Sequence, residues 1–193
     1  MLRVKVFLIF LYSTGGPWPL GYIGLGDFSI GYLGLGDVFV FLYFGLVATM
    51  TPSFIYVSGF SEPLNKVMME LTPYAIQVAS LATNIIIVNN LRDRHTDIDA
   101  KKKTVAVRFG ATFCRSEYSI MLFISYSLVI FDWMQHKSSI GRLLPLLSLL
   151  LARKELKAIY TKDGGSLNPH VGGAAKVQFL FCILLSIGSR SSI

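Results

Sequence analysis

Three oxygen-bearing side chains recur at four-residue intervals near the middle of the sequence: Asn89, Asp93 and Asp97. In an α-helix, residues four apart lie one above the other on the same face, so this spacing would align the three oxygen donors. Neighbouring carboxylates repel each other unless a cation lies between them, and hard oxygen donors suit Mg²⁺. The pattern therefore predicts a Mg²⁺ site in which these three residues are both the metal ligands and the candidate catalytic residues.

Basic side chains beside and after this cluster could offset the charge of a diphosphate group. They are Arg92, Lys102, Lys103 and Arg108. A metal ion and these cations together would stabilise the charge that develops as a carbon–oxygen bond to diphosphate breaks. The spacing leaves an alternative open, because charged residues at a helix end often form only a solvated basic loop with local ion pairs. An EF-hand is excluded, since the D-x-D-x-D-G spacing and the final Glu are missing, and Asp99 is interpreted as solvated.

The composition indicates what must position these residues. Apolar residues make up 53% of the 193-residue chain and charged residues 15%, with a mean hydropathy of +0.57, whereas an ordinary soluble domain is about a quarter charged. Neither 38–61 nor 71–91 contains a charged residue, and each reaches the roughly 20 residues that cross a bilayer as a helix. The +7 net charge is spread over short segments between apolar runs, which argues against nucleic-acid binding.

The apolar runs predict an all-α, multi-pass bundle that forms a single membrane domain over residues 1–193. They are 4–12, 38–58, 72–90, 118–134, 140–152 and 174–189. The first run is too short to span and is interpreted as a truncated helix, with a signal peptide as the alternative. The other five are predicted to span, and a polar loop, 91–117, is expected to carry the Asp cluster.

Basic residues in the connections predict the topology. The segment 91–117 carries seven and 153–176 carries five, and two crossings separate the two segments. Both are therefore expected on the cytoplasmic side, or its organellar equivalent. Residues 21–27 recur as 31–37 in a Gly-rich segment, which could allow close approach to a ligand or serve as a flexible connector.

Around these residues the sequence resembles the UbiA superfamily of intramembrane prenyltransferases, in particular the branch that prenylates 1,4-dihydroxy-2-naphthoate in menaquinone and phylloquinone synthesis. That branch carries N-N-x-R-D-x-x-x-D followed by K-x-T-x-A-V-R-x-G, and residues 89–110 match this pattern. Its Y-T-G-G-P and Y-x-G-L-G-D segments resemble residues 12–17 and 31–37, and its last loop resembles residues 167–176. Lys101 stands where the family usually has Gly.

The resemblance implies a helical bundle around a central cavity, where two Asp-rich motifs bind Mg²⁺ bridged to a prenyl diphosphate. Ionisation would give an allylic cation, which an electron-rich aromatic ring attacks. Asn89, Asp93 and Asp97 match the second motif and Lys102 the basic residue after it, while Arg92 and Arg108 are implied as diphosphate contacts. The first motif should precede residue 12, so the chain is interpreted as N-terminally truncated, as a fragment or a degenerate copy, with doubtful activity by itself.

The predicted function is thus Mg²⁺-dependent transfer of a prenyl group from a prenyl diphosphate to an aromatic acceptor, in a bacterial inner membrane or a plastid membrane. The expected acceptor is 1,4-dihydroxy-2-naphthoate, with 4-hydroxybenzoate, homogentisate or a tetrapyrrole as alternatives. Two other classes stay open. One is a non-catalytic relic or a subunit that binds prenyl lipids, and the other is a transporter, because intramembrane carboxylates often line ion paths.

Overall fold

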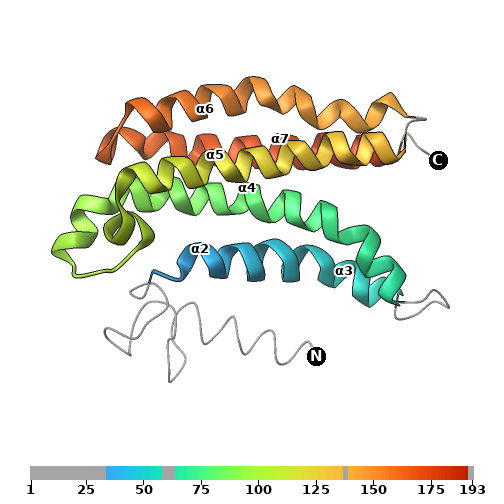
Figure 1. Cartoon of the computed structure of the whole chain (residues 1–193), viewed down its shortest axis with the longest axis horizontal. Coiled ribbons are helices and arrows are strands. Elements are labelled where there is room, and N and C mark those ends of the chain that lie inside the picture. The colour runs from blue at the N-terminus through green and yellow to red at the C-terminus, as the bar shows by residue number, and fades with distance from the viewer. Residues whose placement is uncertain (1–33, 58–63, 137–138, 191–193) are drawn as a thin grey trace.

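The computed structural model describes residues 34–57, 64–136 and 139–190, and the secondary structure in these ranges is entirely helical (Figure 1). The elements are α2 (Gly36–Phe39), the π-helical η2 (Val40–Val47), α3 (Ala48–Val57), α4 (Leu64–Asp99), α5 (Val105–Gln135), the 3₁₀-helical η3 (Ile140–Ser148), α6 (Leu149–Thr161), the 3₁₀-helical η4 (Gly164–Leu167) and α7 (Asn168–Arg190). Residues 4–12, 12–17 and 21–27, which carry several of the sequence-based predictions, lie outside the described ranges.

The predicted all-α, multi-pass architecture is confirmed. Within the described ranges, four helical stretches are long and apolar enough to cross a bilayer: Gly36–Ile55, Asn65–Asp99, Val105–Gln135 and Gly164–Ser189. Each exceeds the roughly 20 residues that a spanning helix needs, except the first, which equals it. The protein is therefore an integral membrane protein.

The fifth predicted span, 140–152, is not among these four stretches. Its residues form η3, which continues into α6, and the combined run crosses the bundle from one end to the other (Figure 1). At about 2.0 Å per residue for the 3₁₀ part and about 1.5 Å for the α part, the run is about 37 Å long. The charged residues of α6 lower its hydropathy: Arg153, Lys154, Glu155 and Lys157. The predicted span at 140–152 thus coincides with an element that runs along the bundle, but this element is not one of the four stretches apolar enough to count as spans.

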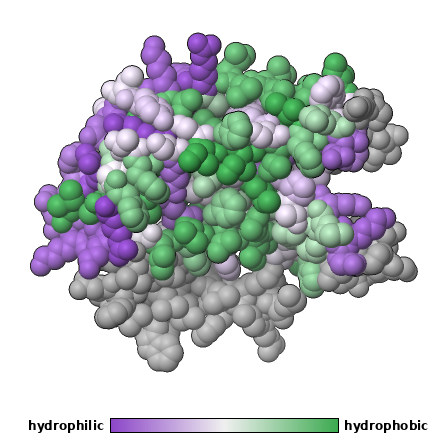
Figure 2. Space-filling model, in the orientation of Figure 1, coloured by the Kyte–Doolittle hydropathy of each residue, from purple (hydrophilic) through white to green (hydrophobic). Residues whose placement is uncertain are grey.

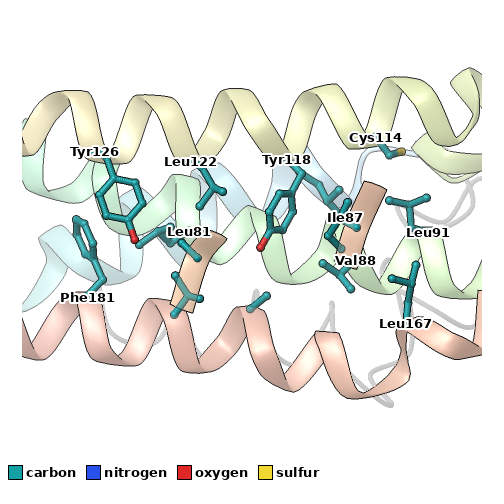
Figure 3. Close-up of a cluster of buried hydrophobic side chains, with 14 of the residues drawn as sticks. Leu81, Ile87, Val88, Leu91, Cys114, Tyr118, Leu122, Tyr126, Leu167 and Phe181 are labelled. Atoms are coloured by element: carbon teal, nitrogen blue, oxygen red, sulfur yellow. The ribbon is translucent and has the colours of Figure 1, made fainter. Parts of the chain in front are cut away.

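The bundle is organised around α4, which lies between α5 on one side and the α2–η2–α3 helix on the other (Figure 1). A Cβ atom at Gly45 of η2 would clash with Ala79 of α4, so the two helices approach closely through small residues. On the other side, side chains of α4, α5 and α7 form the apolar core, with contributions from α6 and from Leu167 of η4 (Figure 3). In this core the rings of Tyr126 and Phe181 meet edge-on, with centroids 5.5 Å apart.

The surface shows the division expected of a protein embedded in lipid. In Figure 2 hydrophobic residues cover the middle of the visible face, and hydrophilic residues gather toward its ends. Large apolar side chains point outward from the spanning helices, such as Phe123 of α5 and Phe179 of α7, which are 73% and 68% exposed. Such extensive apolar exposure is typical of a helix surface that contacts lipid rather than water.

Two connections meet at one end of the bundle, the end at the left of Figure 1. One joins α4 to α5 and the other joins α6 to α7. The predicted polar loop 91–117 is mostly helical, because α4 continues to Asp99 and α5 begins at Val105, leaving only residues 100–104 between them. The segments 91–117 and 153–176 therefore lie at the same end of the bundle, as the distribution of basic residues predicted.

Candidate active site

The predicted metal ligands lie on the last three turns of α4. This helix continues beyond its apolar part without interruption, so Asn89, Asp93 and Asp97 follow one another along one side of a single helix. Asp97 is buried, with 5% of its surface exposed, and Asp93 is partly buried. The helical continuation that the four-residue spacing required is thus present.

Arg92 bridges two of the three predicted ligands. Its Nη2 atom donates hydrogen bonds to Asn89 Oδ1 over 2.9 Å and to Asp93 Oδ2 over 2.6 Å, and its Nε atom donates to Asp93 Oδ1 over 2.8 Å. One nitrogen that carries positive charge is therefore held between an amide oxygen and a carboxylate oxygen. These two oxygens converge on a single cationic group.

Asp97 is held by a different cation. The Lys102 ammonium lies 3.1 Å from Asp97 Oδ1, and the Lys102 N–H donates a hydrogen bond of 2.9 Å to the backbone carbonyl of Asp97. The chain can fold back in this way because Lys101 adopts a left-handed conformation, with φ = 56°. The three predicted ligands are thus divided between two cationic partners.

The other two predicted diphosphate contacts lie farther along the α4–α5 connection. Lys103 and Arg108 are both exposed, and both approach Gly34, just before α2. The glycine that ends the pattern at residues 89–110 also has a structural reason, since Gly110 has φ = 81°, inside the residues of α5. A left-handed conformation of this kind strains other residue types, so glycine is required at this position.

The α6–α7 connection docks against the end of α4. Arg92 donates a hydrogen bond of 3.3 Å to Asn168 Oδ1, and Arg94 and His95 each lie 3.4 Å from Asp163 Oδ2. Partial burial raises the pKa of Asp163, but the hydrogen bonds from His95 and the Gly164 N–H, together with the charge of Arg94, hold this pKa below its ordinary value. Sequence reasoning did not assign a site role to Asn168 or Asp163. The signal for Asn168 was its place in the segment that resembles the family's last loop.

A second asparagine of the motif points elsewhere. Asn90 Nδ2 donates a hydrogen bond of 2.7 Å to Asp37 Oδ1, and both residues are buried. This contact joins α4 to α2 at the residue that follows Asn89. Neither residue was singled out as functional, although Asp37 ends the G-L-G-D pattern and Asn90 is the second residue of N-N-x-R-D.

Asn89 is the last of the α4 residues that line an apolar groove with a volume of about 510 Å³. It lies between η2, α4 and α7, and its lining residues are Val40, Phe44, Ala82, Ile85, Ile86, Asn89, Val171 and Gln178. The only amides among these residues are those of Asn89 and Gln178. The groove therefore offers an apolar surface that leads directly to the polar end of α4.

The donor set fits a magnesium ion in chemistry and in part in geometry. Mg²⁺ binds oxygen ligands, commonly one or two carboxylates together with waters and phosphate oxygens. Asn89 and Asp93 already direct their oxygens at one cationic nitrogen, whereas Asp97 faces Lys102. In the described part of the chain, no group of three or more His, Cys, Asp or Glu side chains is arranged around a common metal position. A site here would thus use the Asn89 amide and oxygens from the substrate.

Comparison with known proteins identifies relatives along the whole chain. 1,4-Dihydroxy-2-naphthoate octaprenyltransferase of Haemophilus influenzae is 29% identical over 188 residues, which are 97% of this chain and 56% of that protein. The protein of the same name from Mycobacterium leprae is 34% identical over 109 residues, which are 56% of this chain and 31% of that protein. UbiA prenyltransferase domain-containing protein 1 of Danio rerio is 32% identical over 143 residues, covering 74% of this chain and 36% of that protein.

The chain thus spans about half the length of the Haemophilus relative. No family model and no solved structure matches it. The resemblance that the motif at residues 89–110 indicated is nevertheless confirmed by these relatives.

Proposed function

We propose that this homologue of the UbiA prenyltransferases transfers a prenyl group from a prenyl diphosphate to an aromatic acceptor, namely 1,4-dihydroxy-2-naphthoate in menaquinone or phylloquinone synthesis. One observation carries the proposal. Asn89 lies both at the head of an apolar groove and beside Asp93 at a shared cationic position. A prenyl diphosphate has the same two parts, an apolar chain joined to a polar head that binds cations.

The residues of the chain then have distinct roles in the reaction. Asn89, Asp93 and Asp97 would hold Mg²⁺, while Arg92, Lys102, Lys103 and Arg108 would bind the oxygens of the diphosphate. When bound, the metal supplies positive charge to the diphosphate and so makes it a better leaving group. The apolar side chains that line the groove, such as those of Ile85, Ile86 and Phe44, would exclude water from the prenyl chain.

In the proposed reaction the allylic carbon–oxygen bond breaks, and its electron pair leaves with the diphosphate oxygen. A carbon–carbon bond forms as the electron-rich ring attacks the allylic carbon. The ring regains its aromaticity by losing a proton or, at a carboxylated position, carbon dioxide. Arg92 and Lys102 would contribute by stabilising the negative charge that gathers on the leaving group.

The proposal includes a membrane orientation, which is supported by the position of two basic segments at the same end of the bundle. Both basic segments, 91–117 and 153–176, would face the cytoplasm of a bacterium or the stroma of a plastid, where soluble substrates are available. Cysteine placed at Lys103 should then react with an impermeant maleimide only from that side. Labelling from the opposite side would contradict the orientation but not the reaction.

The test is product formation in membranes that contain the protein, supplied with Mg²⁺, a prenyl diphosphate and 1,4-dihydroxy-2-naphthoate. A prenylated naphthoquinone-type product is expected, and 4-hydroxybenzoate and homogentisate serve as competing acceptors. Asp93→Asn and Asp97→Asn should each abolish turnover, whereas Asp99→Asn, an exposed aspartate on the same helix, should not. Equal turnover in all three variants would contradict the assignment of the site.

A second candidate function is favoured by the same groove. The chain could bind a prenyl diphosphate without turning it over, as a membrane subunit. If the protein binds a radiolabelled prenyl diphosphate but forms no product with any of the three acceptors, the result would favour a binding function over a catalytic one.

A further inference from the structure

The cationic partners of the predicted metal ligands are the same residues that are predicted to bind the diphosphate. Arg92 holds Asn89 and Asp93, and Lys102 holds Asp97. Each half of the predicted site therefore neutralises the other in the structure described here. A metal ion can reach these oxygens only if the two basic side chains give up their present positions.

The energetic consequence follows from burial. The side chain of Asp97 is 7% exposed, and those of Arg92, Lys102 and Asp93 are 25%, 26% and 34% exposed. Leaving a charge without a partner is therefore most costly at Asp97, which has little access to water, and is less costly at the three partly exposed groups. If a metal ion displaced Arg92 and Lys102 alone, two cations would lose their carboxylate partners. If a diphosphate attracted them alone, the carboxylates would lose theirs.

We infer that Arg92 and Lys102 are internal counterions of the metal ligands, and that metal and diphosphate consequently bind this site with positive cooperativity. The inference rests on the proposed function and adds a regulation of the same site. When both ligands arrive, the carboxylates pair with the metal and the two basic side chains pair with the diphosphate, so no charge is left without a partner. The coupling is reciprocal, because each ligand must change the affinity of the other by the same factor.

The structure also offers Arg92 a contact that does not depend on the carboxylate. Its Nη1 atom donates a hydrogen bond of 3.3 Å to Asn168 Oδ1 of α7. This contact keeps the guanidinium near the end of α4 while its bonds to Asp93 are exchanged. For Arg92, the exchange would therefore need a rotation of its own side chain and no movement of a helix.

The first experiment measures Mn²⁺ binding to the purified full chain without diphosphate, from the loss of the paramagnetic resonance signal of the free ion. Arg92→Gln and Lys102→Gln should each tighten Mn²⁺ binding by about fivefold or more, because the metal no longer has to displace a charge-assisted contact. The control is Lys101→Gln, which removes the same charge from an exposed neighbouring position. Its effect should be less than about twofold, since it removes only distant repulsion.

The second experiment tests the reciprocal half and does not depend on the stability of the Arg92 variant. Binding of inorganic pyrophosphate is measured in the presence of a chelator, so that no divalent metal contributes. Asp93→Asn should tighten pyrophosphate binding, because Arg92 loses its carboxylate partner, while Asp99→Asn should leave this binding close to that of the original protein.

The outcomes separate this inference from the proposed function. If Mn²⁺ binds the original protein but Arg92→Gln and Lys102→Gln weaken its binding, or match Lys101→Gln, the counterion role is wrong and the metal site stands. If Mn²⁺ binds neither the original protein nor any variant, both the counterion role and the proposed metal site are wrong. Tighter binding of Mn²⁺ and of pyrophosphate in the respective variants supports the inference, since a purely structural role would not strengthen either ligand.

Discussion

His170 Nδ1 lies 2.6 Å from Glu155 Oε2, and this contact joins the first turns of α7 to the middle of α6 in a buried position. The Lys162 ammonium lies 2.8 Å from His170 Nε2 on the other side of the ring. An ammonium can only donate, so Nε2 accepts and Nδ1 carries the proton that is donated to Glu155. The three residues form a short relay of hydrogen bonds directly beneath the α6–α7 connection.

Breaking this relay on one side should destabilise the protein. Glu155→Leu would leave the buried N–H of the neutral His170 ring without its acceptor, and we expect the free energy of unfolding to fall by about 1–3 kcal/mol. Glu155→Gln keeps an oxygen acceptor and should cost much less. Thermal unfolding in detergent measures both, and the double variant Glu155→Leu, His170→Leu should recover part of the loss. A double variant no more stable than Glu155→Leu would contradict the pairing.

Asn90 and Asp37 provide a second test of a buried polar contact. Asn90→Leu would leave the Asp37 carboxylate without its donor, and Asp37 Oδ2 already has no partner among the described residues. We expect the variant to lose about 2–4 kcal/mol of stability, since a buried group would lose its remaining contact. The combination with Asp37→Leu should restore stability in the same assay. If the two single effects simply add, the residues are not coupled.

Many contacts of the candidate site could not be predicted from the sequence, because they join residues that are far apart along the chain and meet only in the tertiary structure. The spacing of Asn89, Asp93 and Asp97 predicted a helix that continues past the apolar run, because it depends only on local helical geometry, and α4 does continue to Asp99. The contacts of Asn90 with Asp37 and of Arg92 with Asn168 join residues 53 and 76 positions apart. No local periodicity contains that information.

Other differences have local physical causes. Residues 91–117 looked like a loop because they are highly charged, but Arg, Lys and Glu are good helix formers and both helices extend into this segment. The run 140–152 looked like an ordinary span, whereas its first part is a 3₁₀-helix that contains Pro145. The roles of Asn89, Asp93, Asp97, Arg92, Lys102, Lys103 and Arg108 stay predictions.

Lys101 offers a prediction in which a substitution stabilises the protein. It has φ = 56°, a conformation that favours glycine, and the resembling family usually has glycine at this position. Lys101→Gly should raise the free energy of unfolding by about 0.5–1 kcal/mol, because the left-handed strain disappears.

Lys103→Gly is the matched control for this change, since Lys103 does not have a positive φ. It should lower stability, because glycine loses more conformational entropy on folding. Equal effects of the two substitutions on the melting temperature would show that backbone strain is not the cause.

Replacing either of two buried amide side chains in α4 by an apolar side chain should also stabilise the protein. Gln77 and Asn84 are 0% and 2% exposed, and neither amide has a hydrogen-bond partner among the described residues. Gln77→Leu and Asn84→Leu should each stabilise the protein by about 1–2 kcal/mol, since an unpaired amide is removed from an apolar surrounding. Thr83→Val is the control, because the Thr83 hydroxyl donates to the Ala79 carbonyl and is already paired. A loss of stability in the Leu variants would instead indicate that water binds these amides.

Acid should weaken the contact between α4 and the α6–α7 connection. The pKa of Asp163 is lowered in the folded state, so its ionised form stabilises the fold above about pH 4. This contribution is lost as the pH falls through the lowered pKa. Asp163→Asn should therefore reduce the melting temperature at neutral pH, and the difference from the original protein should vanish in strong acid. A difference that is independent of pH would exclude the charge of Asp163 as the cause.

The two connections at one end of the bundle also determine when the site can form during synthesis. Arg92 and Arg94 belong to the hairpin of α4 and α5, whereas Asn168 and Asp163 belong to the later pair formed by η3–α6 and α7. The ribosome delivers the first pair to the membrane before the second exists. Arg92 and Arg94 can therefore contact Asn168 and Asp163 only after the later pair has been inserted. The carboxylates of Asp93 and Asp97 already have their basic partners, Arg92 and Lys102, within the first pair.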